Sequence, residues 1–449
     1  MQKNIKFVLT FDTYNSKIVL KKGVKMDKQN KLQQIKNLLN PEKRKKKKID
    51  KKVAREDKYK SWEIRTVKSG MESPYMGLYV HIPFCNKKCD YCDFVSYSMD
   101  EEAQRRYLDN LEKEIDMVAM RFSAKEFNTL YIGGGTPSFV FDGFIRELSK
   151  KIFSSFHFVP GFEYTIEVNP SSVTEAKLFE YMQSGVNRVS IGVQCIDDRV
   201  LKHVGRIQSL ENIDTAFKLL HKMKFINIGS DVMIGLPHQT LKSVKQTIEY
   251  LLKQNVKHVS IYTLQIENHT LLFDRVQQGK VKPLDDDTCL KMYNMVYKML
   301  KKAGFIRYEV SNFAKPTFES QHNFKYWNEV EYLGLGVSAH SYINNYRFNN
   351  TKSLAEYIEK LESDQLPIEN KEYLNYEERR TERIMLSLRM ATGLDLEKFK
   401  EDFKEDLLRT HADIIEKLVD MKMIKVENGF LKITEDNFYV SNKIILELL

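Results

Sequence analysis

The chain has 449 residues, of which 42% are hydrophobic and 29% are charged. A chain of this length typically forms two or three domains, and its composition supports a buried core and excludes an intrinsically disordered protein. No stretch approaches the roughly 18 apolar residues of a membrane-spanning helix, so we expect no transmembrane segment. Five cysteines exclude a disulfide-rich scaffold. Without a signal peptide, we expect a cytoplasmic protein in a reducing compartment.

The net charge of +10 is unevenly distributed along the chain. Residues 1–70 carry a net charge of +15 and include the unbroken basic run Lys43–Lys48, whereas the other 379 residues carry −5. Such runs are typical of solvated, disordered segments, so we interpret residues 1–70 as a disordered extension. Nuclear targeting and RNA contact are alternatives for the run, and Met71 and Met76 are alternative starts of translation. Because the basicity lies in the extension, we expect no nucleic-acid-binding face on the folded part.

Six short β-rich runs follow one another from residue 77, and helical patterns such as Glu101–Arg121 and Leu241–Gln254 lie between them. Near-continuous apolar strands that alternate with helices indicate a parallel sheet covered by helices. The repeat therefore predicts an α/β fold with a partial (β/α)6 barrel over residues 71–310. The six runs are Gly77–Pro83, Thr129–Gly135, Tyr164–Pro170, Arg188–Gln194, Ile226–Gly235 and His258–Gln265.

The C-terminal residues 376–449 have a different pattern. It predicts helices over Tyr376–Arg389, Leu396–Phe403 and Thr410–Asp420, followed by a hairpin over Met423–Thr434 that turns at Asn428-Gly429. Three helices and a hairpin predict a smaller α+β domain of winged-helix type. Its mixed charge favours a packing or lid role over DNA binding, and residues 311–375 are interpreted as a connecting segment.

Three cysteines, Cys85, Cys89 and Cys92, lie within eight residues directly after the first predicted strand. A structural zinc site normally has a fourth cysteine or histidine in a paired motif, and Cys195 and Cys289 stand alone in the sequence. Three thiolates suit a four-iron cluster whose fourth iron accepts an external ligand. A zinc site and a coincidental group of thiols are the alternatives.

Polar residues also stand at the ends of later strands: Glu167, Gln194 and Asp231. In a β/α barrel the C-terminal ends of the strands build the active site. Each residue alone has the alternative of capping the following helix, but their recurrence on successive strands favours a site.

The CxxxCxxC spacing, together with Gly133-Gly134-Gly135-Thr136-Pro137 after the second strand, resembles the radical SAM superfamily. This resemblance implies a [4Fe-4S] cluster on the three cysteines, an electron donor for it, and S-adenosylmethionine (SAM) on the open iron, cleaved to a 5′-deoxyadenosyl radical. In the same way it implies that the glycine run binds the SAM amino group and that Glu167 accepts hydrogen bonds from the ribose. The cofactor-binding residues carried over are Tyr79, Tyr91, Gly134, Gly135, Thr136, Glu167, Gln194, Arg206 and Asp231.

From Gly77 to the C-terminus the chain resembles the HemN/HemW family, which contains oxygen-independent coproporphyrinogen III dehydrogenases and haem chaperones. The motifs that carry this resemblance include YVHIPFCNKKCDYCDF, YIGGGTPS, NRVSIGVQ, DVMIGLPHQT and HNFKYWNEVEYLGLG. The dehydrogenases have a further cysteine where this chain has Phe94, and the chaperone branch has phenylalanine there. The HNxxYW motif, His322–Trp327, is tied to haem binding in that branch, so His322 is a candidate axial ligand. Two departures are Gln208, where the family usually has histidine, and Cys195, where it has serine.

The resemblance leaves three functions to compare. The leading interpretation is a haem chaperone that binds haem, the cluster and SAM and passes haem to recipient haemoproteins. The alternative is a coproporphyrinogen III dehydrogenase, which Phe94 disfavours, and the third is a radical enzyme acting on nucleic acid. His81 and His203 are further candidate haem ligands, although the place of His81 within the first strand favours a structural role.

Overall fold

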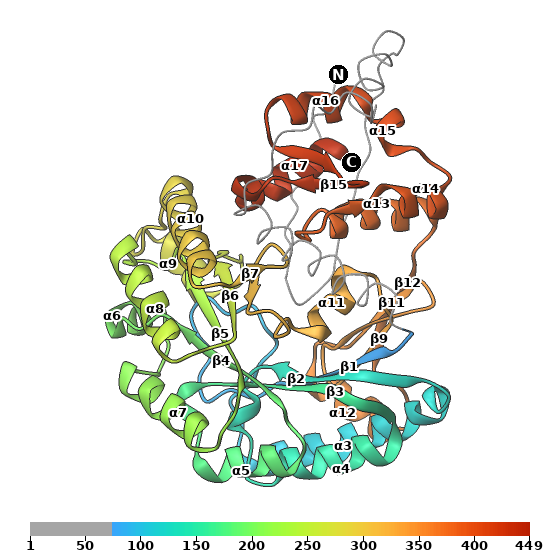
Figure 1. Cartoon of the computed structure of the whole chain (residues 1–449). Coiled ribbons are helices and arrows are strands. Elements are labelled where there is room, and N and C mark those ends of the chain that lie inside the picture. The colour runs from blue at the N-terminus through green and yellow to red at the C-terminus, as the bar shows by residue number, and fades with distance from the viewer. Residues whose placement is uncertain (1–73) are drawn as a thin grey trace. The chain divides into compact units, whose positions relative to one another are not determined.

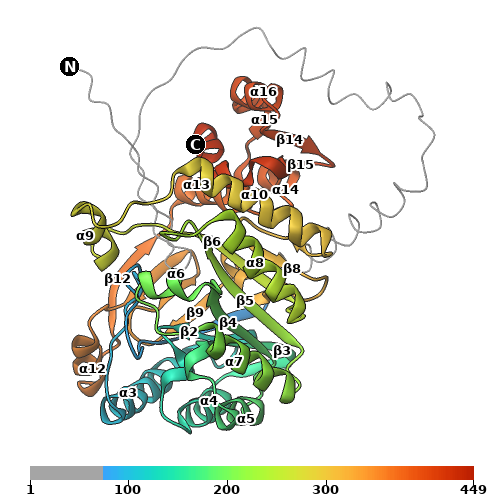
Figure 2. The same ribbon diagram turned by 90° about the vertical axis from the view of Figure 1, so that its left-hand side faces the viewer.

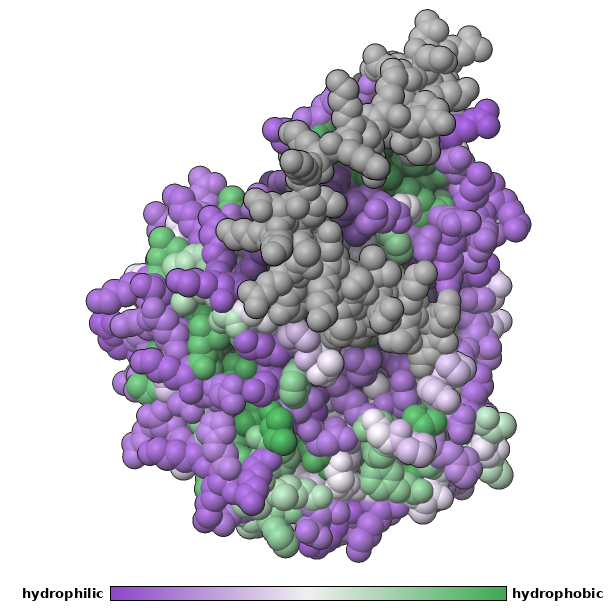
Figure 3. Space-filling model, viewed as in Figure 1, coloured by the Kyte–Doolittle hydropathy of each residue, from purple (hydrophilic) through white to green (hydrophobic). Residues whose placement is uncertain are grey.

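The computed structural model describes residues 74–449, which form two compact units, one ending at Tyr373 and one beginning at Leu374. The expectations for residues 1–70, including the basic run and the alternative start Met71, lie outside the described residues. Met76 is the first residue of strand β1. In the described part of the chain, no helix is both long and apolar enough to cross a membrane. The face in Figure 3 is mostly hydrophilic, with scattered apolar patches.

The six predicted strands are confirmed, and each pairs in parallel with the next (Figure 1). Strand β3 begins at His157 rather than at Tyr164. Its first half contains Pro160 and Gly161, which read as a turn in the sequence. The strands are β1 (Met76–Ile82), β2 (Glu126–Gly134), β3 (His157–Val168), β4 (Arg188–Gln194), β5 (Asn227–Ile234) and β6 (His258–Thr263).

Helices cover the outer face of this curved sheet (Figures 1 and 2). Even-numbered residues of β1, such as Leu78 and Val80, are fully buried, as are Leu108 and Leu111 of α3. Polar N-caps start several helices; Thr240, for example, forms a capping box with Ser243 at α8. The helices are α3 (Glu101–Ala119), α4 (Phe144–Ser155), α5 (Glu175–Gln183), α6 (Asp198–His203), α7 (Leu210–Lys222), α8 (Leu241–Lys253), α9 (Leu271–Gln277) and α10 (Asp286–Lys302).

Residues 306–373 extend the same sheet rather than linking two domains. Strand β9 pairs in parallel with β1, antiparallel strands continue both edges, and the order is β12-β11-β10-β9-β1-β2-β3-β4-β5-β6-β8-β7. The result is an open, partial barrel. The added elements are β7 (Ile306–Arg307), β8 (Asn312–Ala314), α11 (Gln321–Trp327), β9 (Tyr332–Leu335), β10 (His340–Ile343), β11 (Tyr346–Asn350), α12 (Leu354–Glu362) and β12 (Ile368–Tyr373).

The C-terminal unit combines helices with a three-stranded antiparallel sheet of order β13-β15-β14. The predicted hairpin is confirmed, and its turn residues Asn428 and Gly429 both have positive φ, as a tight two-residue hairpin turn requires. The last helix, α17, was not predicted. The elements are α13 (Tyr376–Ser387), β13 (Leu394–Asp395), α14 (Leu396–Phe403), α15 (Leu407–Thr410), α16 (Ala412–Asp420), β14 (Ile424–Glu427), β15 (Phe430–Ile433) and α17 (Ser441–Leu448).

Candidate cluster and cofactor site

The three cysteines lie on one loop that leaves the C-terminal end of β1. All three are free thiols and half-buried, whereas Cys195 and Cys289 are buried elsewhere. Within residues 74–449, no group of three or more histidine, cysteine, aspartate or glutamate side chains is arranged to hold a single metal ion. Each cysteine of an iron–sulfur cluster binds a different iron, so cluster ligands lie further apart than the ligands of one ion. The loop brings three thiols to one place, as a cluster with one open iron requires.

Burial and, after it, the neighbouring Cys89 together raise the pKa of the Cys92 thiol to about 12. Burial likewise raises the pKa of Cys85, although the hydroxyl of Thr136 lies 3.3 Å from its sulfur and partly offsets the effect. The thiols of Cys85 and Cys92 are therefore kept neutral by their surroundings until a metal centre replaces their protons.

Asp90, between the second and third cysteines, anchors the loop to two other elements. Its carboxylate accepts a hydrogen bond of 2.6 Å from Arg275 of α9, and its backbone amide donates to Val204 at 3.0 Å. Arg275 also donates to the carbonyl of His203 at 2.7 Å. Gly205, with φ of +75°, makes room for the Asp90 side chain, because a Cβ atom at position 205 would collide with the Asp90 carboxylate. The cysteine loop is thus held by a charged clamp that the sequence did not reveal.

The glycine run ends β2 directly against the cysteine loop. The amides of Gly135 and Thr136 donate to the carbonyls of Ile82 and Phe84 at 2.8 and 2.7 Å. A Cβ at Gly135 would lie 2.8 Å from the Phe84 carbonyl oxygen, and one at Gly134 would collide with His81. By resemblance the run is expected to bind the SAM amino group, and the structure shows in addition that its glycines face atoms of the cysteine loop and of His81. The glycines first of all permit close packing of the two loops.

Glu167, at the end of β3, is fixed by β2. Its carboxylate accepts a hydrogen bond of 2.7 Å from the Tyr131 hydroxyl and one of 3.1 Å from the amide of Gly134. The predicted acceptor for ribose and the predicted amino-group loop are therefore adjacent. Tyr131 was not among the predicted site residues, because a tyrosine within a strand reads simply as core.

Arg206 connects the cysteine loop to β4. Its guanidinium donates to the Tyr91 hydroxyl at 2.9 Å and lies 3.8 Å from the Cys89 sulfur. It also donates to the Gly192 carbonyl at 3.0 Å and to the Gln208 amide oxygen at 2.6 Å. Gln208 is buried and donates back to Gly192 and Val193. Gln208, which stands where the family usually has histidine, thus orients Arg206, the arginine predicted for the SAM site.

The other predicted residues lie on the same inner face of the sheet. Tyr79 is buried, and its hydroxyl lies 3.0 Å from Nδ1 of His81, whose other nitrogen lies 3.0 Å from the Val95 carbonyl. Gln194 ends β4 with φ of +63°, a conformation that non-glycine residues rarely adopt. Burial raises the pKa of Asp231, and the hydroxyl of Ser190 donates to it at 3.2 Å, which partly offsets the shift.

His322 lies on helix α11, on the inner face of the sheet, and is only 1% exposed. Its Nδ1 is 2.8 Å from the Thr129 hydroxyl and its Nε2 is 2.9 Å from the Tyr326 hydroxyl. Burial and, after it, the charge of Lys325 together lower its pKa to about 3. It packs beside Tyr131, with ring centroids 5.2 Å apart. Both ring nitrogens are therefore engaged within the protein, and iron ligation by His322 requires one of these hydrogen bonds to be exchanged.

Known protein families match both units of the chain. The model of the radical SAM superfamily matches residues 79–251, and that of the HemN C-terminal domain matches residues 374–440. Heme chaperone HemW of Lactococcus lactis is 31% identical over 371 residues, which are 83% of this chain and 96% of the relative. Heme chaperone HemW of Bacillus subtilis is 30% identical over 367 residues, 82% of this chain and 97% of the relative.

A solved structure shares the fold. Coproporphyrinogen III oxidase HemN of Escherichia coli aligns with a TM-score of 0.74 over 85% of this chain and 92% of its own, at 23% identity. At that identity the likeness shows the architecture and not the reaction. The predicted α/β fold with a partial barrel and a smaller C-terminal domain is thus confirmed. Because the sequence similarity spans nearly the whole length of the HemW relatives, the chain belongs to the HemW family of radical SAM proteins.

Proposed function

We propose that this protein is a haem chaperone that carries a [4Fe-4S] cluster and SAM, binds haem and delivers it to recipient haemoproteins. The observation that carries the proposal is the similarity to relatives named heme chaperone HemW over 96–97% of their length. We place the activity in the cytoplasm, because five cysteines in 449 residues do not form a disulfide-rich pattern and a reducing compartment is the default for such a chain.

In this proposal Cys85, Cys89 and Cys92 hold the cluster, and an electron donor reduces it. Together with SAM, the cluster supplies a one-electron reductant and a source of a carbon radical. The protein's own part is positional: the Asp90–Arg275 clamp fixes the loop, and Arg206 places a positive charge beside it. A cation near anionic thiolates stabilises them, which favours the assembled centre.

SAM would lie over the C-terminal ends of β2 to β5, against Gly134, Gly135 and Thr136. The Glu167 carboxyl group is held there as an acceptor by Tyr131 and the Gly134 amide. Charge-assisted hydrogen bonds from ribose hydroxyls to such a carboxylate are about twice as strong as neutral ones. The remaining contacts in this proposal come from Tyr79, Tyr91, Gln194, Arg206 and Asp231.

A second candidate function is oxidative decarboxylation of coproporphyrinogen III. The shared fold with HemN is compatible with it, whereas Phe94 stands where, by resemblance, the dehydrogenases carry a cysteine. HemW is therefore the better-supported relative for function as well as for sequence.

One set of measurements separates the two functions. The cluster is reconstituted anaerobically, haem is titrated into the protein, and transfer to an apo-haemoprotein is followed by absorption. The proposal expects haem binding and transfer without turnover of coproporphyrinogen III. Robust decarboxylation by a protein that binds no haem would instead establish the dehydrogenase.

A further inference from the structure

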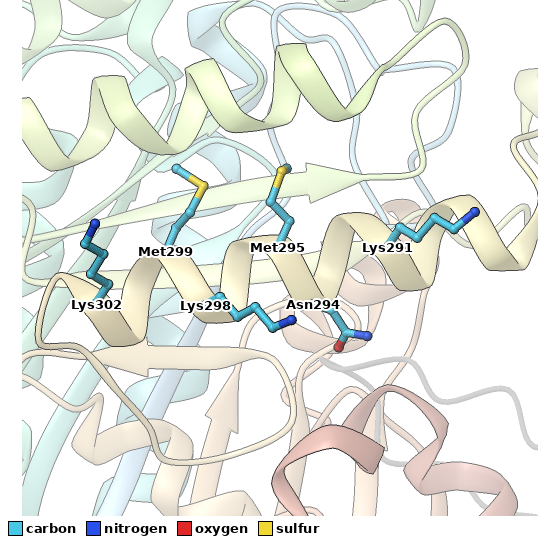
Figure 4. Close-up of a pocket in the computed structure, with 6 residues that line it drawn as sticks. All are labelled: Lys291, Asn294, Met295, Lys298, Met299 and Lys302. Carbon is cyan, nitrogen blue, oxygen red and sulfur yellow. The ribbon is translucent and has the colours of Figure 1, made fainter.

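Two hollows stand out in the described part of the barrel unit. The hollow along α10 has a volume of 530 Å³, but every residue that lines it belongs to that one helix (Figure 4). The other has a volume of 340 Å³ and lies between strands β9 to β12 on one side and, on the other, the end of α3 with the short 3₁₀ helix Met120–Phe122. Because its walls come from several elements, this second hollow can surround a small molecule. We call it the β9–β12 pocket.

The β9–β12 pocket is on the outer, helix-covered face of the sheet. Leu333 and Leu335 of β9 line it, and they pair in register with Leu78 and Val80 of β1. Successive side chains of a strand point to opposite faces, so these leucines point away from Tyr79 and the inner face. The pocket is therefore separate from the candidate cluster and cofactor site.

Most of the pocket lining is apolar, and part of it is accessible. Val118 and the two leucines of β9 are buried, whereas four further apolar side chains around them are only half-buried: Phe122, Phe348, Leu366 and Ile368. Neighbouring strands lie about 4.8 Å apart, so the three steps from β12 to β9 give the pocket a length of about 14 Å. An extended apolar chain suits this space, because its burial removes apolar surface from water along the whole length.

The free charges at the pocket are positive. Arg121 and Lys371 line it and are exposed, and neither side chain forms an ion pair with any residue between positions 74 and 449. The Lys371 ammonium lies 4.4 Å from the centre of the Tyr346 ring, which also lines the pocket. Residues 71–449 carry a net charge of −5, so two unpaired cations beside one apolar pocket contrast with the rest of the folded chain. They attract an anionic group to its rim.

The one acid among the lining residues, Glu114, is occupied by donors of the protein. It is only 2% exposed, and its carboxyl group accepts hydrogen bonds from the Tyr357 hydroxyl at 2.6 Å, the Asn350 side chain at 2.6 Å and the Gly336 amide at 2.8 Å. Burial raises the pKa of Glu114, although the three donors partly offset this. Glu114 is therefore not available to pair with the cations at the rim.

We propose that the β9–β12 pocket binds an amphipathic carboxylate, a free fatty acid of medium chain length. Its chain lies across strands β9 to β12, and its carboxylate pairs with the cations at the rim, Arg121 and Lys371. The inference goes beyond the proposed haem-chaperone function and depends on neither haem nor SAM. Exposed ion pairs are individually weak, so burial of the apolar chain supplies most of the affinity and the charges select an anion.

The test is a calorimetric titration of the intact chain with decanoate. One saturable site is expected, and decylammonium, which has the same chain and the opposite charge, should bind about tenfold more weakly. Leu366→Trp puts a bulkier side chain into the pocket and should weaken decanoate binding about tenfold. Arg121→Gln combined with Lys371→Gln should weaken decanoate binding, by up to about fivefold for each exposed ion pair, and remove the preference over decylammonium.

A matched control is available on α4. Arg146 and Lys150 are exposed there and do not line the pocket, and Arg146→Gln combined with Lys150→Gln gives the same net charge as the double variant of the rim. This control should bind decanoate like the unmodified protein. Thermal unfolding of each variant shows whether it is folded, and the rim variant changes only exposed side chains, so it tests the site even if Leu366→Trp does not fold.

Each other outcome overturns the proposal. The unmodified protein would then bind no decanoate, or bind decylammonium equally well, or lose the same affinity in the rim and control variants, in which case only net charge matters. Binding to vesicles of anionic phospholipid but not to free decanoate, weakened by the pocket variants, would assign the pocket to a membrane lipid instead. Haem binding should be the same in all variants, so failure of this site leaves the haem-chaperone function untouched.

Discussion

Replacing Arg275 by methionine should weaken the cysteine loop more than the rest of the protein. The substitution keeps most of the apolar stem and removes three hydrogen bonds. These are one of 2.6 Å to the Asp90 carboxylate, one of 2.7 Å to the His203 carbonyl and one of 3.2 Å to the His203 ring. It leaves the Asp90 carboxylate, 15% exposed, without its cation. Exposed ion pairs contribute up to about 1 kcal/mol and broken buried pairs cost 3–5 kcal/mol, so for this half-buried pair we expect a loss of about 2 kcal/mol.

The measurement is the rate of iron loss to a chelator after anaerobic reconstitution, together with the free energy of unfolding in denaturant. A loss of 2 kcal/mol in the loop corresponds to about thirtyfold easier opening, since 1.4 kcal/mol is a factor of ten. Arg199→Met is the matched control, because Arg199 forms a pair with Asp197 at 3.0 Å but is 91% exposed. Equal iron loss from both variants would refute the clamp, and so would a fall in global stability with no change in iron loss per folded molecule.

Four further predictions concern single residues. Cys92→Ser should prevent cluster assembly, whereas Cys195→Ser should not; iron content and absorption after reconstitution decide this, and a cluster in the first variant would exclude Cys92 as a ligand. Glu167→Gln should weaken SAM binding about tenfold in equilibrium dialysis without unfolding the sheet, and unchanged affinity would remove Glu167 from the site. Burial raises the pKa of Glu309 from 4.5 to about 7, so the folded state binds this proton more tightly and stability should fall as pH rises from 4.5 to 7. In denaturant titrations, Glu309→Gln should remove up to about 3 kcal/mol of this fall in the free energy of unfolding, and an unchanged pH dependence would contradict the prediction. His322→Ala should lower the free energy of unfolding by about 2 kcal/mol, since it removes two buried hydrogen bonds, and an unchanged free energy of unfolding in denaturant titrations would contradict this.

The parallel strands and their helices were predictable because their pattern is local. Each strand is a short apolar run, and each helix repeats its apolar residues at 3.6-residue spacing. Strands β9 to β11 have only four or five residues and gain their place from pairing with distant partners, such as Gly77 with Tyr332. Because the pairing partner of such a strand lies 255 positions away, the sequence around the strand shows no local pattern. Residues 311–375 are therefore interpreted from the sequence as a connecting segment.

The candidate site was predictable where spacing alone carries the chemistry. Three cysteines within eight residues indicate a metal centre whatever surrounds them. The clamp is formed by Asp90 and Arg275, which are 185 positions apart. Arg206 is oriented by its hydrogen bond to Gln208, which lies in a buried loop. Charged and amide side chains of this kind are common on protein surfaces, so nothing in the sequence marks these four as partners.

The HNxxYW motif shows why a match to a motif does not by itself assign a ligand. Gly77 is the residue that lets His322 approach β1, since a Cβ there would lie 3.1 Å from the imidazole. The imidazole in turn packs against Tyr131, whose hydroxyl holds the carboxylate of Glu167. A buried ring with two satisfied nitrogens fixes its neighbours firmly, because breaking either hydrogen bond leaves a buried polar atom unpaired. In this chain the histidine of the motif therefore helps to hold Tyr131, and through it Glu167, on the predicted SAM side of the sheet.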